Sequence, residues 1–172
     1  MNMRLTLLVG LVLAFPIHRG PGKCDAVEPP SAATFEPADW PMYNHDAAGW
    51  RFNPAEKTLS PGNVGKLIEK WRFPAATAKE VIGVVHATPT VVAGEVYFGT
   101  ATFPAFYKLS PTGALRWVYR DPARKSVLPP TDGAPVTGKL RDAASDAGIF
   151  SSALVWADAV YFADTGGRMY CL

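Results

Sequence analysis

The sequence carries very little excess charge of either sign. Its 17 Lys and Arg residues stand against 15 Asp and Glu residues, which gives the 172-residue chain a formal net charge of +2. A protein that binds nucleic acid electrostatically needs a much larger basic excess, so no nucleic-acid partner is expected. Charged residues make up 19% of the chain, below the usual quarter, which disfavours a long solvated helical bundle.

Cysteine and histidine are scarce as well. The two cysteines, Cys24 and Cys171, cannot build a disulfide-dense scaffold or a four-thiolate zinc site. The three histidines are widely spaced. We interpret the pair His45 and Asp46 as a cap in which the carboxylate accepts backbone N–H groups. The residues themselves therefore indicate no metal site.

Disordered and collagen-like classes are excluded by the composition. Hydrophobic residues make up 48% of the chain, whereas a disordered chain combines low hydrophobicity with high net charge. The 15 Gly and 16 Pro residues follow no collagen-like period. The remaining class is a globular protein with enough apolar material for a core.

Long apolar runs are missing except for Leu5–Phe15, which follows the basic residue Arg4 and precedes Pro16. This run is too short to span a bilayer, and its layout is typical of a secretory signal peptide. We predict a signal peptide at residues 1–26, cleaved after Ala26. The protein is therefore expected in the periplasm or outside the cell, with no transmembrane segment after cleavage.

Cleavage at this position has consequences for the remaining chain. Without residues 1–26 only Cys171 is left, so no internal disulfide is expected. A lipid anchor at Cys24 and a buried N-terminal strand or helix are the alternatives. Residues 27–38 are rich in Pro, Ala and Ser and predict a linker.

Short segments rich in Val, Tyr, Phe and Thr, separated by Gly and Pro, begin at Trp71 and are typical of strands and turns. A series of four strands is followed by a similar series about 64 residues later. Repeated four-strand units indicate a β-propeller, whose blades are four-stranded sheets. The predicted strands lie at 88–92, 95–99, 106–109 and 115–119, and then at 152–156, 160–163 and 169–172.

We therefore predict an all-β fold, a partial β-propeller of about two four-stranded blades. Residues 39–172 form an extended arm, from Asp39 to the residue before Trp71, and these first blades. Asn63–Leu67 forms a helical turn, and residues 121–148 form a loop on one face. Because propellers contain about four to eight blades, we expect an N-terminal piece of a longer protein whose remaining blades are its partners. The alternative is closure by oligomerisation.

Several motifs occur together in the arm and the first strands. DWPxYxxD at 39–46, RFNP at 51–54, NVxxL at 63–67 and WxF at 71–73 come first, then ATPxVVxGxVY at 87–97 and TGxxxW at 112–117. This set resembles the PQQ-binding-like β-propeller repeat family, whose best-known members are the quinoprotein alcohol dehydrogenases. The resemblance implies an eight-bladed propeller or a relative of it.

The resemblance also implies roles for individual residues. In the family's tryptophan-docking motif a Trp packs between neighbouring blades and a Thr-Gly turn fixes its approach, which assigns blade docking to Trp71, Thr112, Gly113 and Trp117. Trp40 and Trp50 are expected to fasten the arm to the propeller.

Cofactor-binding positions depart from the family pattern. His86 stands where those dehydrogenases often have Glu, and Ser151, with Ser152, stands where they have Arg. Residues 121–150 lack the adjacent cysteine pair of the family. His86 and Ser151 are the candidate cofactor-binding residues, and the alternative for His86 is a hydrogen-bonded channel histidine. No catalytic residue is assigned.

Two functions follow from the resemblance. The first is a quinoprotein dehydrogenase-like oxidoreductase that acts on alcohols or polyols with PQQ and Ca²⁺ and passes electrons to a cytochrome. The second is a non-catalytic scaffold for protein or carbohydrate binding, similar to an outer-membrane assembly lipoprotein. The fold alone does not decide between them.

Overall fold

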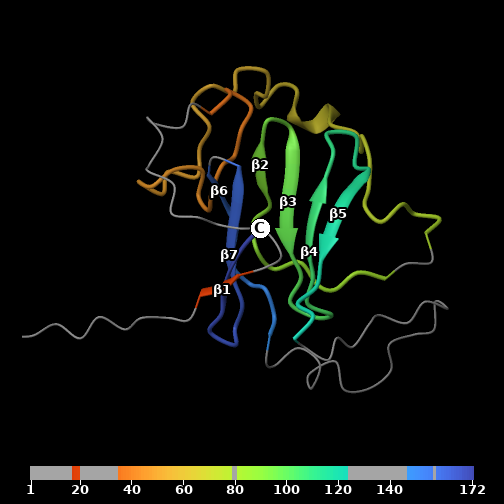
Figure 1. The fold of residues 1–172 in the computed structure, drawn as a ribbon. Coiled ribbons are helices and arrows are strands. Elements are labelled where there is room, and N and C mark those ends of the chain that lie inside the picture. Colours follow the sequence, from red (N-terminus) through yellow and green to blue (C-terminus); the bar gives the residue numbers. More distant parts are fainter. Residues whose placement is uncertain (1–16, 20–34, 79–80, 124–146, 157) are drawn as a thin grey trace, which may run out of the picture.

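Two β-sheets form the body of the molecule (Figure 1). The structure, a computed structural model, describes residues 17–19, 35–78, 81–123, 147–156 and 158–172. The first sheet is antiparallel and follows chain order, with strands β2 (Thr90–Val92), β3 (Glu95–Gly99), β4 (Phe106–Leu109) and β5 (Leu115–Tyr119). The second sheet contains β6 (Leu154–Trp156), β7 (Ala159–Ala163) and β8 (Met169–Cys171), with β1 (Ile17–Arg19) beside β8.

This architecture confirms the predicted all-β fold with two blade-like sheets. The strands β3, β4 and β5 have the predicted bounds, and the others differ by one or two residues at an end. The hairpin between β2 and β3 turns at Ala93 and Gly94, whose φ angles of 51° and 75° are those of a tight primed turn. A single 3₁₀ turn, η1 (Val64–Lys66), takes the place of the predicted helical turn.

The N-terminal segment contributes β1, which pairs with β8 in parallel. The strand takes the edge of β8 that corresponds to the place of β5 beside β4 in the first sheet. Cys171 in β8 is disulfide-bonded in the full 172-residue chain, whereas the expectation of no internal disulfide concerns the chain without residues 1–26. The rest of the predicted signal peptide, most of the linker and most of the 121–148 loop lie outside the described residues.

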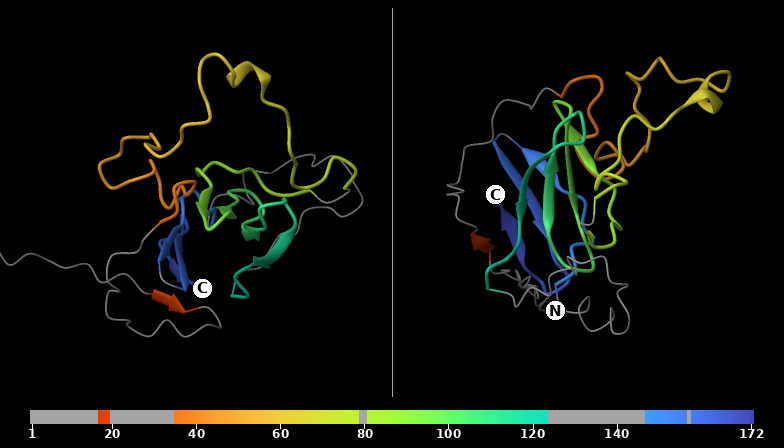
Figure 2. Two further views of the ribbon diagram at one scale, coloured as in Figure 1. Left: turned by 90° about the horizontal axis from the view of Figure 1, so that it is seen from above. Right: turned by 90° about the vertical axis from the view of Figure 1, so that its right-hand side faces the viewer.

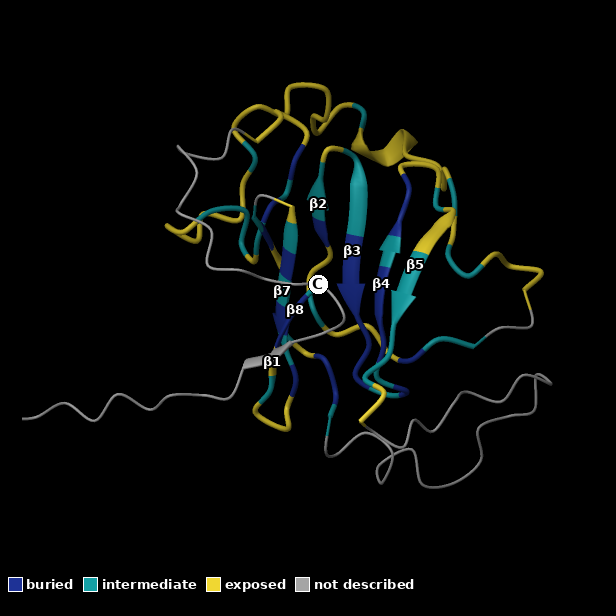
Figure 3. Cartoon of the chain, in the orientation of Figure 1, coloured by how far each residue is buried: buried dark blue, intermediate teal, exposed yellow. Residues whose placement is uncertain are grey.

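The main core lies between the two sheets, where the inner faces of β3, β4, β7 and β8 are buried (Figure 3). The ring of Phe106 stacks on that of Phe162, with centroids 4.0 Å apart and an interplanar angle of 7°. The buried hydroxyl of Thr90 donates a hydrogen bond of 2.7 Å to the carbonyl of Ala153, across the two sheets. Fully buried and partly buried residues alternate along β7, which is the period of a strand that packs one face on a core.

The opposite face of the first sheet is covered by the chain that leads into it. Its buried residues Phe98, Tyr107 and Leu109 pack with residues that precede β2, namely Trp71, Phe73 and Ile82. The face of the second sheet that points away from the first has no such cover among the described residues, and Leu154 and Met169 on it are 38% and 47% exposed.

A polar cluster joins the two sheets at the end of β5. The Arg168 guanidinium donates to Asp121 Oδ2 at 2.6 Å, and the Tyr170 hydroxyl lies 3.0 Å from the same oxygen and 2.8 Å from Asp164 Oδ2. Burial opposes ionisation of Asp121, but hydrogen bonds from the Ala123 amide, Tyr170 and Arg168 lower its pKa below the ordinary value of 3.8. Burial and the two carboxylates raise the pKa of Tyr170, so its hydroxyl stays protonated.

The lowered pKa of Asp121 predicts acid sensitivity. A carboxyl whose pKa is lower in the folded state stabilises the fold above its unfolded pKa, and this stabilisation is lost as the pH falls through the folded value. We expect Asp121→Asn to cost about 2 kcal/mol at pH 7 and to weaken the loss of stability below about pH 4, measured by urea unfolding at several pH values. Glu69→Gln breaks the exposed pair with Arg72 and is expected to cost at most a few tenths of a kcal/mol. An equal cost for both variants would contradict this account.

The arm meets the first sheet at β2 and then reaches away from both sheets (Figure 2). Trp40 pairs with Val91 through two backbone hydrogen bonds, of 2.7 and 2.9 Å. Asp46 accepts the Trp50 amide at 3.3 Å, as expected for a cap. The expectation that Trp50 fastens the arm is wrong, because its side chain is 71% exposed.

Candidate functional site

His86 and Phe150 form a stacked pair at the entrance to the first strands of the two sheets. Their ring centroids lie 4.9 Å apart with an interplanar angle of 21°. Phe150 follows His86 by the 64 residues that separate the two strand series, so the pair joins equivalent positions of the two repeats. Both side chains are exposed, and the imidazole makes no hydrogen bond to a described residue.

The loop after β3 makes hydrogen bonds to the residues that precede His86 and to the residue that precedes Phe150. The Val84 amide donates to Thr102 Oγ1 at 2.9 Å, and the Ile149 amide donates to the Thr100 carbonyl at 3.1 Å. Gly99 permits this close approach, because a Cβ atom there would lie 2.2 Å from Cγ2 of Ile149. The stacked pair is therefore fixed by backbone contacts on either side of it.

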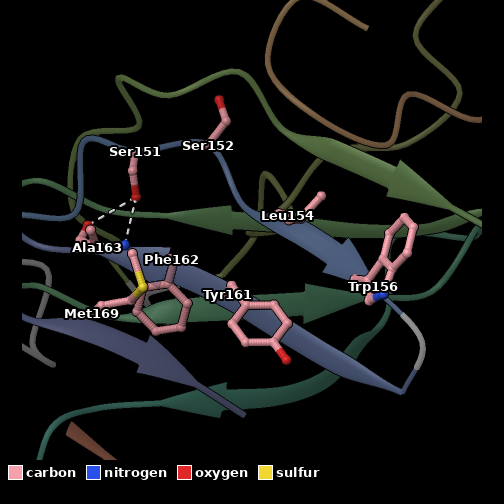
Figure 4. Close-up of a pocket in the computed structure, with 8 residues that line it drawn as sticks. All are labelled: Ser151, Ser152, Leu154, Trp156, Tyr161, Phe162, Ala163 and Met169. Carbon is pink, nitrogen blue, oxygen red and sulfur yellow. Dashed lines mark hydrogen bonds between the residues drawn. The ribbon is translucent and has the colours of Figure 1, made fainter. Parts of the chain in front are cut away.

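Ser151 lies next to Phe150 but its hydroxyl is committed elsewhere. The Oγ atom donates to the Ala163 carbonyl and accepts from the Ala163 amide, both at 2.9 Å (Figure 4). This pair of hydrogen bonds to β7 gives Ser151 a structural contact within its own sheet. The structure thus brings the His86 ring and Ser151 to the same end of the sheets. Of these two side chains, the imidazole is the one that makes no hydrogen bond to a described residue.

Ser151 also lines a hollow of about 550 Å³ on the outer face of the second sheet. Figure 4 shows that the hollow is lined by side chains of β6, β7 and β8 and by the two serines before β6. We call four of its large residues the open face of the second sheet; they are Leu154, Trp156, Tyr161 and Met169. Few polar atoms lie in it, so its chemistry suits an apolar partner more than a reaction.

The repeat explains why this face is open. Its four residues are the repeat equivalents of residues on β2, β3 and β4 that face the second sheet, namely Thr90, Val92, Tyr97 and Phe106. In the first sheet these positions are covered by the second sheet. The open face therefore corresponds, position by position, to the face of the first sheet that packs on its neighbour.

The predicted docking residues do not all meet. The Trp71 ring lies on Gly113, where a Cβ atom would come within 2.7 Å of Cδ2, and its Nε1 donates to the Pro111 carbonyl at 3.0 Å. The Thr112 hydroxyl is bonded to that of Ser110 at 2.9 Å and closes the same turn. Trp117 points the other way, toward Tyr97 and Phe106 and the core between the sheets.

One family profile matches the chain over residues 40–138. It is described as the glucose/ethanol/alcohol dehydrogenase β-propeller domain, under the name PQQ. The match covers more than half of the sequence, including the arm from Trp40 and the whole first sheet. The chain belongs to this family. No curated protein matches it.

Membership of the PQQ β-propeller family raises the question of whether the described residues fit that cofactor. They offer one exposed imidazole stacked on a phenyl ring, whereas the Ser151 hydroxyl is already bonded. Among the described residues no group of three or more His, Cys, Asp or Glu side chains could hold a metal ion. These residues alone do not make a PQQ and Ca²⁺ site, and we derive no reaction step from them. The described part of the chain also contains no helix that could cross a membrane.

Sequence reasoning missed two features of this propeller segment. Phe150 was identifiable as the repeat equivalent of His86, since the lag of the strand series leads from one to the other. The Asp121, Arg168 and Tyr170 cluster had no local signal, because its members are 47 and 49 residues apart in sequence.

Proposed function

We propose that the chain is the N-terminal part of an exported quinoprotein dehydrogenase-like oxidoreductase that acts on alcohols or polyols. PQQ supplies hydride acceptance when bound, and Ca²⁺ is its expected companion. The match to the dehydrogenase propeller domain over residues 40–138 is the observation that carries the proposal. The signal-like pattern of residues 1–26 supports export to the periplasm or beyond.

The open face supports a second element of this proposal, the presence of further blades. Propellers contain about four to eight blades, and the described residues form two sheets. In the complete protein a further sheet would cover Leu154 and Met169 as the second sheet covers the first. The cofactor and substrate would then be bound by residues of several blades, with a cytochrome as electron acceptor.

The proposal is tested on the complete gene product that contains this chain. The purified protein is incubated with PQQ and Ca²⁺, and dye reduction is followed with short alcohols and polyols. Saturable PQQ binding with alcohol-dependent dye reduction is expected. Absence of quinone binding, measured by absorbance and calorimetry, would overturn the enzyme assignment.

His86→Ala tests the ring of the site whose nitrogens make no hydrogen bond to a described residue. Because the side chain is exposed, the free energy of unfolding of the variant is expected to lie within about 0.5 kcal/mol of that of the parent. PQQ affinity is expected to fall several-fold if the imidazole contacts the cofactor. Thr165→Ala, at an exposed turn position of the second sheet, is the control. Unchanged PQQ affinity in His86→Ala would remove this residue from the cofactor site.

The second candidate is a non-catalytic propeller scaffold that binds protein or carbohydrate. The specific observation in its favour is that the Ser151 hydroxyl, at the position of the family's arginine, is bonded to the backbone of its own sheet. A complete gene product that folds, lacks quinone binding and retains a macromolecular partner would support this candidate.

A further inference from the structure

A small pocket lies where the arm meets the start of the first sheet. It has a volume of about 310 Å³ and is lined by residues of the arm and by one residue just before β2, namely Trp40, Tyr43, Asn44, Arg51 and Thr88. This volume is at the lower end for ligand pockets and gives room for one ring with its substituents. The pocket shares no lining residue with the His86 site or the open face.

The polar groups of this pocket are mostly hydrogen-bond donors that are not in use. The Arg51 side chain donates to a described residue through Nε, in a hydrogen bond of 2.9 Å to Asn44 Oδ1. Its two terminal guanidinium nitrogens donate to no described residue. The Asn44 amide nitrogen and the Thr88 hydroxyl make no hydrogen bond to a described residue. The indole N–H of Trp40, another lining residue, is buried and has no acceptor among the described residues.

The described residues that line the pocket carry no negative charge. None of them is a carboxylate, and Arg51 forms no ion pair with a described residue. Two acidic residues close in sequence to the lining residues accept backbone amides: Asp39 accepts those of Glu36 and Ala93, and Asp46 accepts that of Trp50. An uncommitted guanidinium beside other donors favours an oxyanion, to which it can present two parallel N–H groups.

The backbone fixes this arrangement in advance. Asn44 and Arg51 adopt left-handed φ angles of 62° and 54°, which are uncommon for residues other than glycine. The Arg51 amide donates to the Asn44 carbonyl at 3.0 Å, parallel to the side-chain bond between the same residues. Strained residues held by surrounding bonds are typical of binding and catalytic sites.

Two aromatic side chains give the pocket its apolar part. Tyr43 is 56% exposed, and no described ring stacks on it. Among the described rings, that of His45 meets Trp40 edge to face, with centroids 5.1 Å apart. Aromatic faces of this kind pack against flat rings. We propose that the pocket binds a small cyclic carboxylate whose carboxylate pairs with Arg51 and whose ring packs against Tyr43 and Trp40.

The test compares benzoate with benzamide, which has the same shape without the charge, on the full 172-residue chain without PQQ. Calorimetry at low salt is expected to give benzoate about tenfold tighter binding than benzamide. Arg51→Gln is expected to abolish this preference. Arg72→Gln removes an exposed arginine that does not line the pocket, and it is expected to keep the preference. Equal binding of the two probes, or an unchanged preference in Arg51→Gln, would overturn the proposal.

Two further experiments, with another variant and another probe, test the same site. Asn44→Asp places a carboxylate on the Arg51 guanidinium at a position where Asp tolerates the left-handed backbone, so it is expected to remove the preference even if Arg51→Gln fails to fold by circular dichroism. Retained preference in Asn44→Asp would count against the site. Inorganic phosphate, an oxyanion without a ring, is expected to bind more weakly than benzoate, and tighter binding of phosphate would overturn the cyclic ligand.

Discussion

Replacing Gly113 by alanine is expected to destabilise the chain by about 3 kcal/mol, the combined cost of a left-handed alanine and of overpacking. Gly113 has a φ of 79°, and an added Cβ would lie 2.7 Å from the Trp71 indole. The ring cannot withdraw freely, since its Nε1 is bonded to the Pro111 carbonyl and its body packs on the apolar cluster beneath the first sheet. Urea unfolding followed by circular dichroism measures the effect.

Gly167→Ala is the matched control for this prediction. Gly167 has nearly the same φ, 77°, but no atom lies within 4 Å of its added Cβ. Its substitution is therefore expected to cost only the left-handed conformation, about 1 kcal/mol. Equal losses in the two variants would show that the Trp71 contact with the turn contributes nothing to stability.

The second large effect is expected in the association of the chain. The open face exposes a continuous apolar surface at an edge of the fold, and such surfaces drive association or aggregation. The full chain is expected to sediment as associated species at micromolar concentration. Leu154→Lys combined with Met169→Lys, which places two charges on this face, is expected to shift most of the protein to monomer.

Leu67→Lys combined with Ile68→Lys controls for added charge alone. These arm residues are 63% and 88% exposed and lie away from the open face, near η1. If sedimentation velocity gives the same shift to monomer for both double variants, the open face is not the surface that associates. If the parent chain is monomeric, the surface has no tendency to associate at all.

The strands could be predicted from the sequence because their signal is local. Alternating apolar residues bounded by Gly and Pro identified Glu95–Gly99, Phe106–Leu109 and Leu115–Tyr119 with their observed bounds. The repeat lag then placed the second series, since the same pattern recurs with the same turns. Local patterning and repetition together therefore determined the fold class.

Contacts between distant segments could not be predicted in the same way. The sequence placed Trp117 and the Thr112–Gly113 turn in one motif, but the ring that lies on this turn is Trp71. Asp121 belonged to the predicted loop at 121–148, yet its side chain is only 10% exposed and pairs with Arg168. Such pairings depend on how the sheets face one another, which no local pattern records.

The candidate site was predictable in position and much less in role. His86 was identified from its place before an inner strand, and it lies at the entrance of the first sheet as an exposed ring. Ser151 was chosen by its alignment with a cofactor-binding arginine of the family. The bonds of its hydroxyl to Ala163 could be found only in the structure.

The most direct measurement is oxidative footprinting of Met169, the most exposed residue of the open face at 47%. If the two sheets are neighbouring blades of a larger propeller, Met169 is expected to be modified several-fold more slowly in the complete gene product than in the 172-residue chain, diluted until it sediments as a monomer. Met42 of the arm, distant in sequence from this face, is expected to react at the same rate in both. Equal reactivity of Met169 in the two proteins would contradict the account.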